Sequence, residues 1–253
     1  MRLTTSRAGR GGLVDDRISP AAPRARRSDL PVRLASALLM LAVTIAALVI
    51  GGRVFDAFVV LVALVAFAEF VMLVMKATGS VAIRLAAILA GALYFGFAGG
   101  VLAGAGDFLI VLIIGVTVFT DTFAYFSGRT IGGPKVAPSI SPNKTWAGVI
   151  GGMIGAGLWV VLWIVAIDGG IAGPRFELGL PLIAENLGLA AVLGAILAVL
   201  AQAGDFFESW LKRRAGVKDS STLIPGHGGV FDRVDGMLPV AIAVGVLAAT
   251  LVN

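Results

Sequence analysis

Seven mostly apolar stretches, each close to twenty residues long, constrain the fold more than any other feature of the sequence. About 20 consecutive apolar residues cross the hydrocarbon core of a bilayer as one helix. The chain of 253 residues is 58% hydrophobic and 14% charged, whereas soluble domains are about one quarter charged. We therefore predict an all-α polytopic membrane protein with about seven transmembrane helices, within a range of about seven to nine. The predicted spans are 32–50, 54–75, 81–103, 107–128, 147–167, 187–204 and 237–252.

The chain divides into a short polar segment and a long apolar one. Residues 1–31 are rich in Arg, Ser, Pro and Gly and show no apolar periodicity, which predicts a disordered basic tail. Such a tail is expected to lie beside anionic lipid headgroups, and we predict no nucleic-acid partner. Residues 32–253 form the predicted transmembrane domain.

The positions of the basic residues predict the orientation in the membrane. With seven spans, all of the twenty Lys and Arg residues except Arg53 and Arg175 fall on one side. Because positive loops face the cytoplasm, the N-terminus and the two long polar connectors, 129–146 and 205–236, are predicted to be cytoplasmic. The predicted location is the inner, cytoplasmic membrane of the cell.

Several carboxylates lie inside or beside the predicted spans, where an unpaired charge is costly. Glu69 lies deep in the second span, and Asp121 lies near the cytoplasmic end of the fourth. If the sixth span continues as a helix, further polar residues occupy positions i, i+3, i+4 and i+7 and share one face. A solvated helix end at the interface is the alternative explanation of that face. Its members are Asp205, Glu208, Ser209 and Lys212.

The segment "LIPGHGGVFDRVDG" (223–236) follows this face. Its glycines allow close approach of a ligand, and Asp232 and Asp235 lie one helical turn apart. The chain has no Cys and one His, so the carboxylates favour a hard cation such as Mg²⁺. Together with nearby Lys and Arg, they indicate phosphoryl or nucleotidyl transfer. His227 could be a proton donor, a phosphate ligand or a structural hydrogen-bonding group.

The other cytoplasmic connector, within "GRTIGGPKVAPSISPNKTWAGVIGG" (128–152), alternates hydroxyl and Lys residues with glycines and prolines. That pattern suits phosphate binding, although the Walker-A spacing is absent. The alternative is a basic interfacial loop that Trp146 anchors at headgroup level. The phosphate-binding candidates are Lys135, Ser141, Asn143, Lys144 and Thr145.

Together these segments resemble the phosphatidate cytidylyltransferases, the integral-membrane CDP-diacylglycerol synthases. The resemblance is closest in "SWLKRRAGVKDSSTLIPGHGGVFDRVD" (209–235), where the Ser, Lys-Arg, Lys-Asp, His-Gly-Gly and Asp-Arg-apolar-Asp elements of the family signature all occur. "GDFFES", "DTFAYFSGR" and "SPNKTWAGVIGG" are also similar to family motifs, and "AFAEF" around Glu69 is a looser match. The resemblance covers about residues 32 to 253.

The resemblance implies that CTP and phosphatidic acid give CDP-diacylglycerol and pyrophosphate with Mg²⁺; a second, monovalent cation is left open. The groups it implies for catalysis are Asp205, Asp232, Lys212 and His227. Those implied for the metal are Asp205, Asp232, Ser209, Glu208 and Asp235. Those implied for substrate binding are Asp121, Lys135, Ser141, Asn143, Lys144, Thr145, Arg213, Lys218, Asp219, Gly228, Gly229 and Arg233.

Three alternatives share parts of this pattern. A CTP-dependent prenol kinase or an ether-lipid cytidylyltransferase would use the same charges on another lipid. A cation-coupled transporter would explain Glu69 and Asp121 but leaves the basic, Gly-rich connector unexplained. Gly-rich spans such as 151–157 permit close helix contacts and are compatible with a homodimer.

Overall fold

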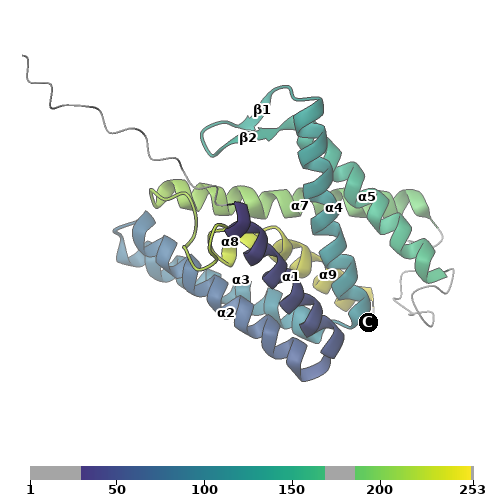
Figure 1. Ribbon diagram of the computed structural model, residues 1–253, viewed down its shortest axis with the longest axis horizontal. Helices are drawn as coiled ribbons and strands as arrows, with labels where there is room; N and C mark the ends of the chain where they lie inside the picture. Colours follow the sequence, from purple (N-terminus) through teal and green to yellow (C-terminus); the bar gives the residue numbers. More distant parts are fainter. Residues whose placement is uncertain (1–29, 169–185, 252–253) are drawn as a thin grey trace, which may run out of the picture.

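The computed structural model describes residues 30–168 and 186–251, so the predicted tail and the 169–185 connector lie outside the described residues. In chain order, and with the labels of Figure 1, the elements are α1 (Leu30–Ile50), α2 (Gly52–Ala77), α3 (Val81–Gly104), α4 (Asp107–Thr130), β1 (Lys135–Ala137), β2 (Ser141–Thr145), α5 (Trp146–Asp168), α7 (Leu187–Arg214), α8 (Phe231–Val234) and α9 (Met237–Leu251).

Within the described ranges, six helices are long and apolar enough to cross a membrane, namely α1, α2, α3, α4, α5 and α7. They define a multi-pass membrane protein and match six of the seven predicted spans. The seventh corresponds to α9, whose 15 residues extend about 22 Å, less than the ~30 Å of a bilayer core. Helix α7 is longer than predicted, because it continues through the charged stretch to Arg214.

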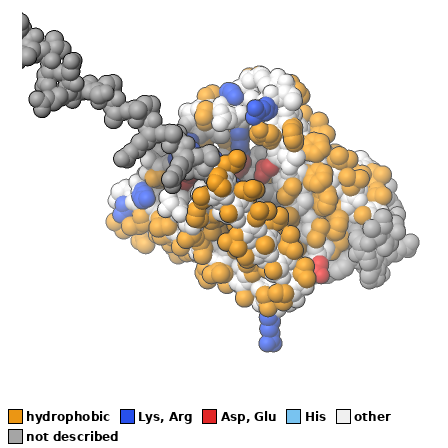
Figure 2. All heavy atoms as spheres, in the orientation of Figure 1, with side chains coloured by type: hydrophobic (Ala, Val, Ile, Leu, Met, Phe, Trp, Pro, Cys, Tyr) orange, Lys and Arg blue, Asp and Glu red, His pale blue; other side chains and the backbone are white. Residues whose placement is uncertain are grey.

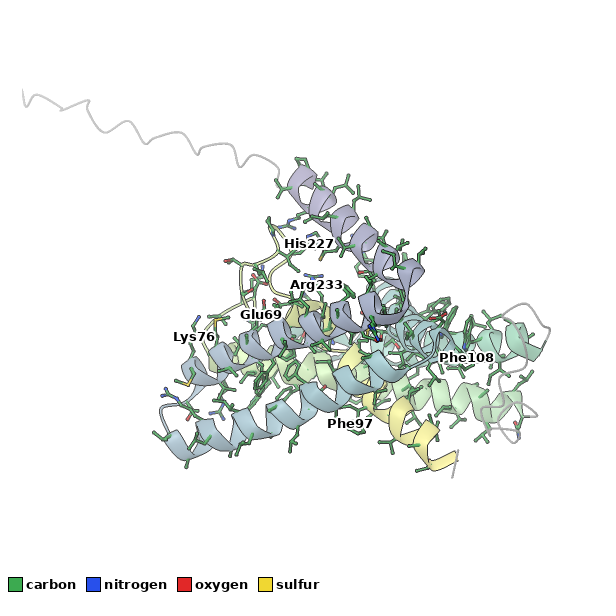
Figure 3. All side chains as sticks on the ribbon, turned by 90° about the horizontal axis from the view of Figure 1, so that it is seen from below. Glu69, Lys76, Phe97, Phe108, His227 and Arg233 are labelled. Atoms are coloured by element: carbon green, nitrogen blue, oxygen red, sulfur yellow. The ribbon has the colours of Figure 1, made fainter. Side chains whose placement is uncertain are left out.

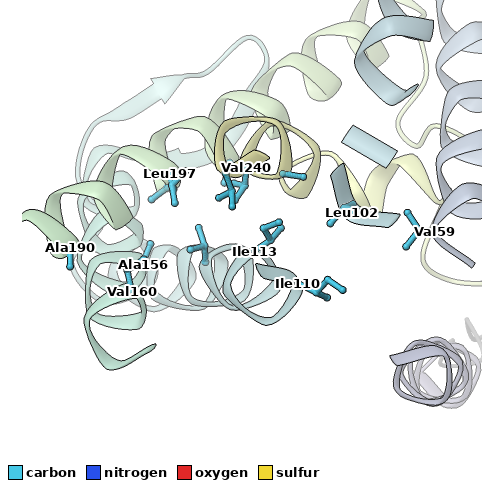
Figure 4. Close-up of a cluster of buried hydrophobic side chains, with 14 of the residues drawn as sticks. Val59, Leu102, Ile110, Ile113, Ala156, Val160, Ala190, Leu197 and Val240 are labelled. Atoms are coloured by element: carbon cyan, nitrogen blue, oxygen red, sulfur yellow. The ribbon is translucent and has the colours of Figure 1, made fainter. Parts of the chain in front are cut away.

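The helices pack closely where small residues face one another. Helices α4 and α5 lie side by side, and α7 crosses both (Figure 1). A Cβ added to Gly194 of α7 would lie 2.5 Å from the backbone oxygen of Ala156 in α5. Glycine thus permits backbone contact between helices, as is common in membrane proteins. Apolar side chains of α4, α5, α7 and α9 fill the space between them (Figure 4).

Two features differ from an entirely helical fold with peripheral loops. The connector after α4 contains an antiparallel hairpin of β1 and β2, paired at Lys135–Thr145 and Ala137–Ser141. The polar segment after α7 folds back and leads into the short helix α8. On the visible face, apolar side chains cover much of the surface, and several Lys and Arg side chains gather near a hollow towards its upper edge (Figure 2).

Candidate functional site

The C-terminal part of α7 carries the polar face that its spacing predicts. Lys212 Nζ lies 2.5 Å from Glu208 Oε2, one turn back, and 2.6 Å from Asp232 Oδ1 in α8. Glu208 is 2% exposed and Lys212 is 13% exposed, so little water screens the pair. The continued helix is confirmed, and Lys212 joins α7 to α8.

The β-hairpin contacts the same part of α7 through two basic side chains. Lys144 of β2 forms an ion pair with Asp205, and its Nζ lies 4.7 Å from the ring centroid of Phe206. Arg213 Nε donates to the backbone oxygen of Ile140 at 3.3 Å. Both cations were predicted to bind substrate, and in this structure both contact groups of the protein itself.

Asp232 is held by groups on both sides of its carboxylate. Oδ2 accepts hydrogen bonds from the Ser220 backbone nitrogen and hydroxyl, both at 2.9 Å, and from the Gly229 nitrogen at 2.8 Å. Burial alone would raise the pKa of Asp232, but hydrogen bonds with Glu208, Lys212 and these backbone groups lower it below its ordinary value. Asp232 is therefore ionised at neutral pH.

The two glycines of the "HGG" segment leave room for carboxylates. Gly228 has a φ of +84°, and a Cβ there would lie 2.7 Å from Asp232 Oδ2. A Cβ on Gly229 would overlap the Ser220 hydroxyl and the Glu69 carboxylate. Both positions are predicted to bind substrate. In the structure, the atom nearest to an added Cβ is Asp232 Oδ2 at Gly228 and the Ser220 hydroxyl, followed by the Glu69 carboxylate, at Gly229.

Replacing Gly229 by Ala is therefore expected to displace the loop. Overpacking of a closely packed site costs about 1–3 kcal/mol. We expect a clear fall in the melting temperature of Gly229→Ala. Gly79→Ala is the matched control, because a Cβ there has nothing within 4 Å. Equal melting temperatures for the two variants would contradict the packing described here.

A cavity of about 530 Å³ lies between α4, β2, α5 and α7. This volume falls within the ~300–1,000 Å³ typical of small-molecule sites. Five of the predicted site residues line it, and they bring charge and hydrogen-bonding groups from three elements, α4, β2 and α7, to one space. They are Asp121, Asn143, Lys144, Thr145 and Asp205.

Three further polar residues of the cavity wall were not predicted from the sequence as site residues, namely Tyr125, Arg129 and Gln202. Arg129 Nη1 donates to the Tyr125 hydroxyl at 2.9 Å within α4, and Gln202 Nε2 donates to a backbone oxygen of α5 at 3.4 Å. The position of Arg129 directly after the fourth apolar run was a usable signal. Gln202 is likewise a lone polar side chain within an apolar run, which is unfavourable without a partner.

His227 lies away from this cavity. Its Nδ1 is 2.8 Å from the hydroxyl of Ser36 in α1, and that hydroxyl also lies 2.9 Å from the backbone oxygen of Pro225. Arg233 donates to the backbone oxygen of His227. Figure 3 shows His227 and Arg233 on the side of the loop that faces α1. Of the roles left open for His227, the hydrogen-bonding one is the role that these contacts display.

Other predicted residues are less closely assembled. Lys135 is exposed, and its Nζ donates to a backbone oxygen of β2 at 3.4 Å. Lys218 and Asp219 are exposed and make no side-chain hydrogen bond or ion pair within the described part of the chain. Ser141 and Ser209 are partly buried. Their roles towards substrate or metal stay predictions.

Asp235 is a second acid with a displaced pKa. It is 8% exposed, and burial raises its pKa well above the ordinary value. The neighbouring Asp205 and Glu208 carboxylates act in the same direction, because a like charge disfavours ionisation. The two acids of α7, Asp205 and Glu208, thus form one connected cluster with Asp232 of α8 and Asp235 at its C-cap.

This cluster has the carboxylate chemistry of a cation site, but its oxygens are not arranged around one common point. Among the described residues, no three acids or histidines are arranged to hold a metal ion as they stand. Glu208 Oε1 is nevertheless buried without a hydrogen-bond partner. Carboxylate oxygens are the ligands that Mg²⁺ takes alongside substrate phosphates, so the donor set fits it. The cluster's acids, Asp205, Glu208, Asp232 and Asp235, outnumber its lysines, Lys144 and Lys212.

The chain belongs to the cytidylyltransferase family, whose model matches residues 91–251. Relatives named phosphatidate cytidylyltransferase include those of Brucella melitensis, 45% identical over 133 residues, Haemophilus influenzae, 40% over 132, and Rickettsia felis, 37% over 130. These matches cover 52%, 52% and 51% of this chain and 43%, 42% and 54% of the relatives. The chain thus spans about half the length of the curated relatives it matches. The family predicted from the motifs is confirmed.

Proposed function

We propose that this protein transfers the cytidylyl group of CTP to phosphatidic acid. A phosphate oxygen of phosphatidic acid attacks the α-phosphorus of CTP and forms the new P–O bond of CDP-diacylglycerol. The bond from the α-phosphorus to the bridging oxygen breaks, and pyrophosphate leaves with its electron pair. The observation that carries the proposal is the junction of a charged α7–α8 cluster with the 530 Å³ cavity, in a chain of the cytidylyltransferase family.

The protein's own contribution is to position two anions and to balance their charge. Lys144 and Arg129 line the cavity and contact Asp205 and Tyr125 respectively. Phosphate oxygens of a bound substrate can replace these two partners and pair with both cations. Lys212, between two acids, keeps the α7 face and α8 together. The nucleophile is a lipid phosphate, so no nucleophilic side chain is needed.

The proposed cofactor is Mg²⁺. The excess of acids over lysines supports a second, monovalent cation bound in addition to Mg²⁺. When bound, Mg²⁺ would neutralise phosphate charge and polarise the reacting phosphate. Asp205 and Asp232 are its proposed principal ligands. The other proposed members of the metal environment are Glu208, Ser209 and Asp235.

The proposed setting is the cytoplasmic membrane. The positive-inside rule favours a cytoplasmic N-terminus and a cytoplasmic site, where CTP is available. The lipid substrate would enter from the inner leaflet, beside the apolar helices. A homodimer is a further proposal, which rests on the Gly-rich spans.

The direct test uses purified protein, phosphatidic acid, CTP and Mg²⁺. We expect CDP-diacylglycerol and pyrophosphate in equal amounts, and no product when EDTA replaces Mg²⁺. Transfer of only the γ-phosphate would instead indicate a kinase, and a preference for ether lipids would change the substrate. Cation flux in liposomes without CTP turnover would support a transporter and contradict the proposal.

A further inference from the structure

Glu69 is a buried carboxylate in the middle of α2 that contacts a segment more than 150 residues away. It is 2% exposed. Oε1 accepts hydrogen bonds from the Ser221 hydroxyl at 2.6 Å and the Val230 nitrogen at 3.1 Å. Oε2 accepts from the Ser220 hydroxyl at 2.9 Å and the Phe231 nitrogen at 2.7 Å. Figure 3 shows Glu69 on α2 beside the loop that leads to α8.

Four donors on one carboxylate make a specific attachment. No Lys or Arg of the described residues forms an ion pair with Glu69, so hydroxyl and backbone N–H groups replace the water it has lost. These donors come from both ends of the loop, at 220–221 and at 230–231. Glu69 therefore ties the start and the end of the loop to α2.

The attachment reaches Asp232 through shared partners. The Ser220 hydroxyl lies 2.9 Å from Glu69 Oε2 and 2.9 Å from Asp232 Oδ2. It has one proton and therefore donates to one carboxylate at a time. The Ser220 and Gly229 nitrogens donate to Asp232. Because Glu69 holds residues 220 and 230 in place, it also holds these two backbone donors in position for Asp232.

We propose that Glu69 is a positioning residue for Asp232. It holds the loop so that Asp232 Oδ2 meets its backbone donors while Oδ1 faces Lys212. The effect of Glu69 on turnover rests on the proposed function. Its effect on the position of the loop does not. Glu69 lies outside residues 91–251, which the family model matches.

Glu69→Gln is the closest test in shape. The amide keeps one acceptor oxygen but places an NH₂ group against backbone or hydroxyl donors. Loss of hydrogen bonds to a charged group corresponds to about 10–100-fold in an equilibrium. We expect the Mg²⁺ concentration for half-maximal rate to rise about tenfold or more, with a smaller change in the KM for CTP.

Two readouts do not depend on turnover. Hydrogen exchange of the amides in 219–232 should become about 10–100-fold faster in Glu69→Gln. Mn²⁺ binding to the protein, followed by electron paramagnetic resonance, should weaken in parallel. Asp56→Asn is the matched control, since Asp56 lies in the same helix and makes no side-chain hydrogen bond or ion pair with described residues.

Thermal unfolding would show whether Glu69→Gln folds. If it does not fold, two serine variants test the same contacts. Ser221→Ala removes a group that contacts Glu69 but not Asp232, and should raise exchange less than Ser220→Ala. Ser220→Ala and Glu69→Gln should be less than additive, because they share one network. Where Glu69→Gln does not fold, Ser221→Ala decides the proposal, because Ser221 acts on Asp232 only through Glu69: weaker Mn²⁺ binding supports the positioning role, and unchanged Mn²⁺ binding overturns it.

The outcomes separate the two proposals. A wild-type protein that makes no CDP-diacylglycerol contradicts the proposed function, and exchange in 219–232 still tests Glu69. An active wild type with unchanged exchange and Mg²⁺ dependence in Glu69→Gln overturns the positioning role. Faster exchange with unchanged Mg²⁺ dependence and Mn²⁺ binding also overturns it, since Glu69 would then hold the loop without affecting Asp232.

Discussion

Asp232→Asn is expected to lower turnover on the order of 10³-fold, because removing one preorganised electrostatic group from a catalytic site costs about 10²–10³-fold. Asn keeps the size of the side chain but removes the charge that Lys212 neutralises. Its NH₂ group would also face either Lys212 or the backbone donors of Ser220 and Gly229. Both changes weaken a site that depends on a fixed anion.

The lowered pKa of Asp232 adds an expectation about stability. A carboxyl group whose pKa is lower in the folded protein stabilises the fold above its unfolded pKa, near 3.9. That contribution is present at neutral pH and is lost as the pH falls through the folded pKa. Asp232→Asn should therefore melt at a lower temperature than wild type at pH 7, with the difference shrinking in acid.

Rates of CDP-diacylglycerol formation and melting curves measure both effects. Asp107→Asn is the control, since Asp107 is exposed in the first turn of α4 and outside the cluster. Wild-type turnover in a folded Asp232→Asn protein would contradict the assignment of Asp232 to the metal and the reaction.

Lys212→Met is expected to have the largest effect on stability. Removing one partner of a buried ion pair costs about 3–5 kcal/mol, because the other charge stays buried. Here the partners are two, Glu208 and Asp232, at 2% and 7% exposure. We expect a large fall in the melting temperature and loss of activity.

Two comparisons isolate the charge effect. Arg214→Met removes a neighbouring cation that is exposed and stacks on Trp210 at 5.5 Å, so it should change stability little. Adding Glu208→Gln to Lys212→Met should restore part of the lost stability, because it removes one of the unpaired carboxylates. Equal stability of the Lys212 and Arg214 variants would be inconsistent with a buried ion-pair network.

Much of the helical frame could be predicted because each span carries its own apolar signal. The fourth span, predicted at 107–128, is observed at Asp107–Thr130. The polar face of α7 followed from spacing alone, since residues three and four apart share a helix face. The count of about seven is not confirmed, because the described residues of the last apolar helix, α9, are fewer than a full span needs.

The remainder depends on contacts between distant segments, which leave no local pattern. "SPNKT" contains Pro and polar residues and favours a loop, yet pairing with β1 makes it a strand. The sequence marked Glu69 as a costly buried acid but could not give its partners near residues 220 and 230. Likewise, nothing near His227 indicates its contact with Ser36.

The packing around Gly229 has a consequence for how mutational scans of this protein should be interpreted. In a saturation library, every substitution at this position would introduce a Cβ into space that Ser220 and Glu69 occupy. Gly229 would then score as intolerant as Asp232, although it offers no side chain to a substrate. Loss of variants from such a library would therefore reflect side-chain volume at Gly229 and charge at Asp232. Only assays on purified variants would separate these two causes.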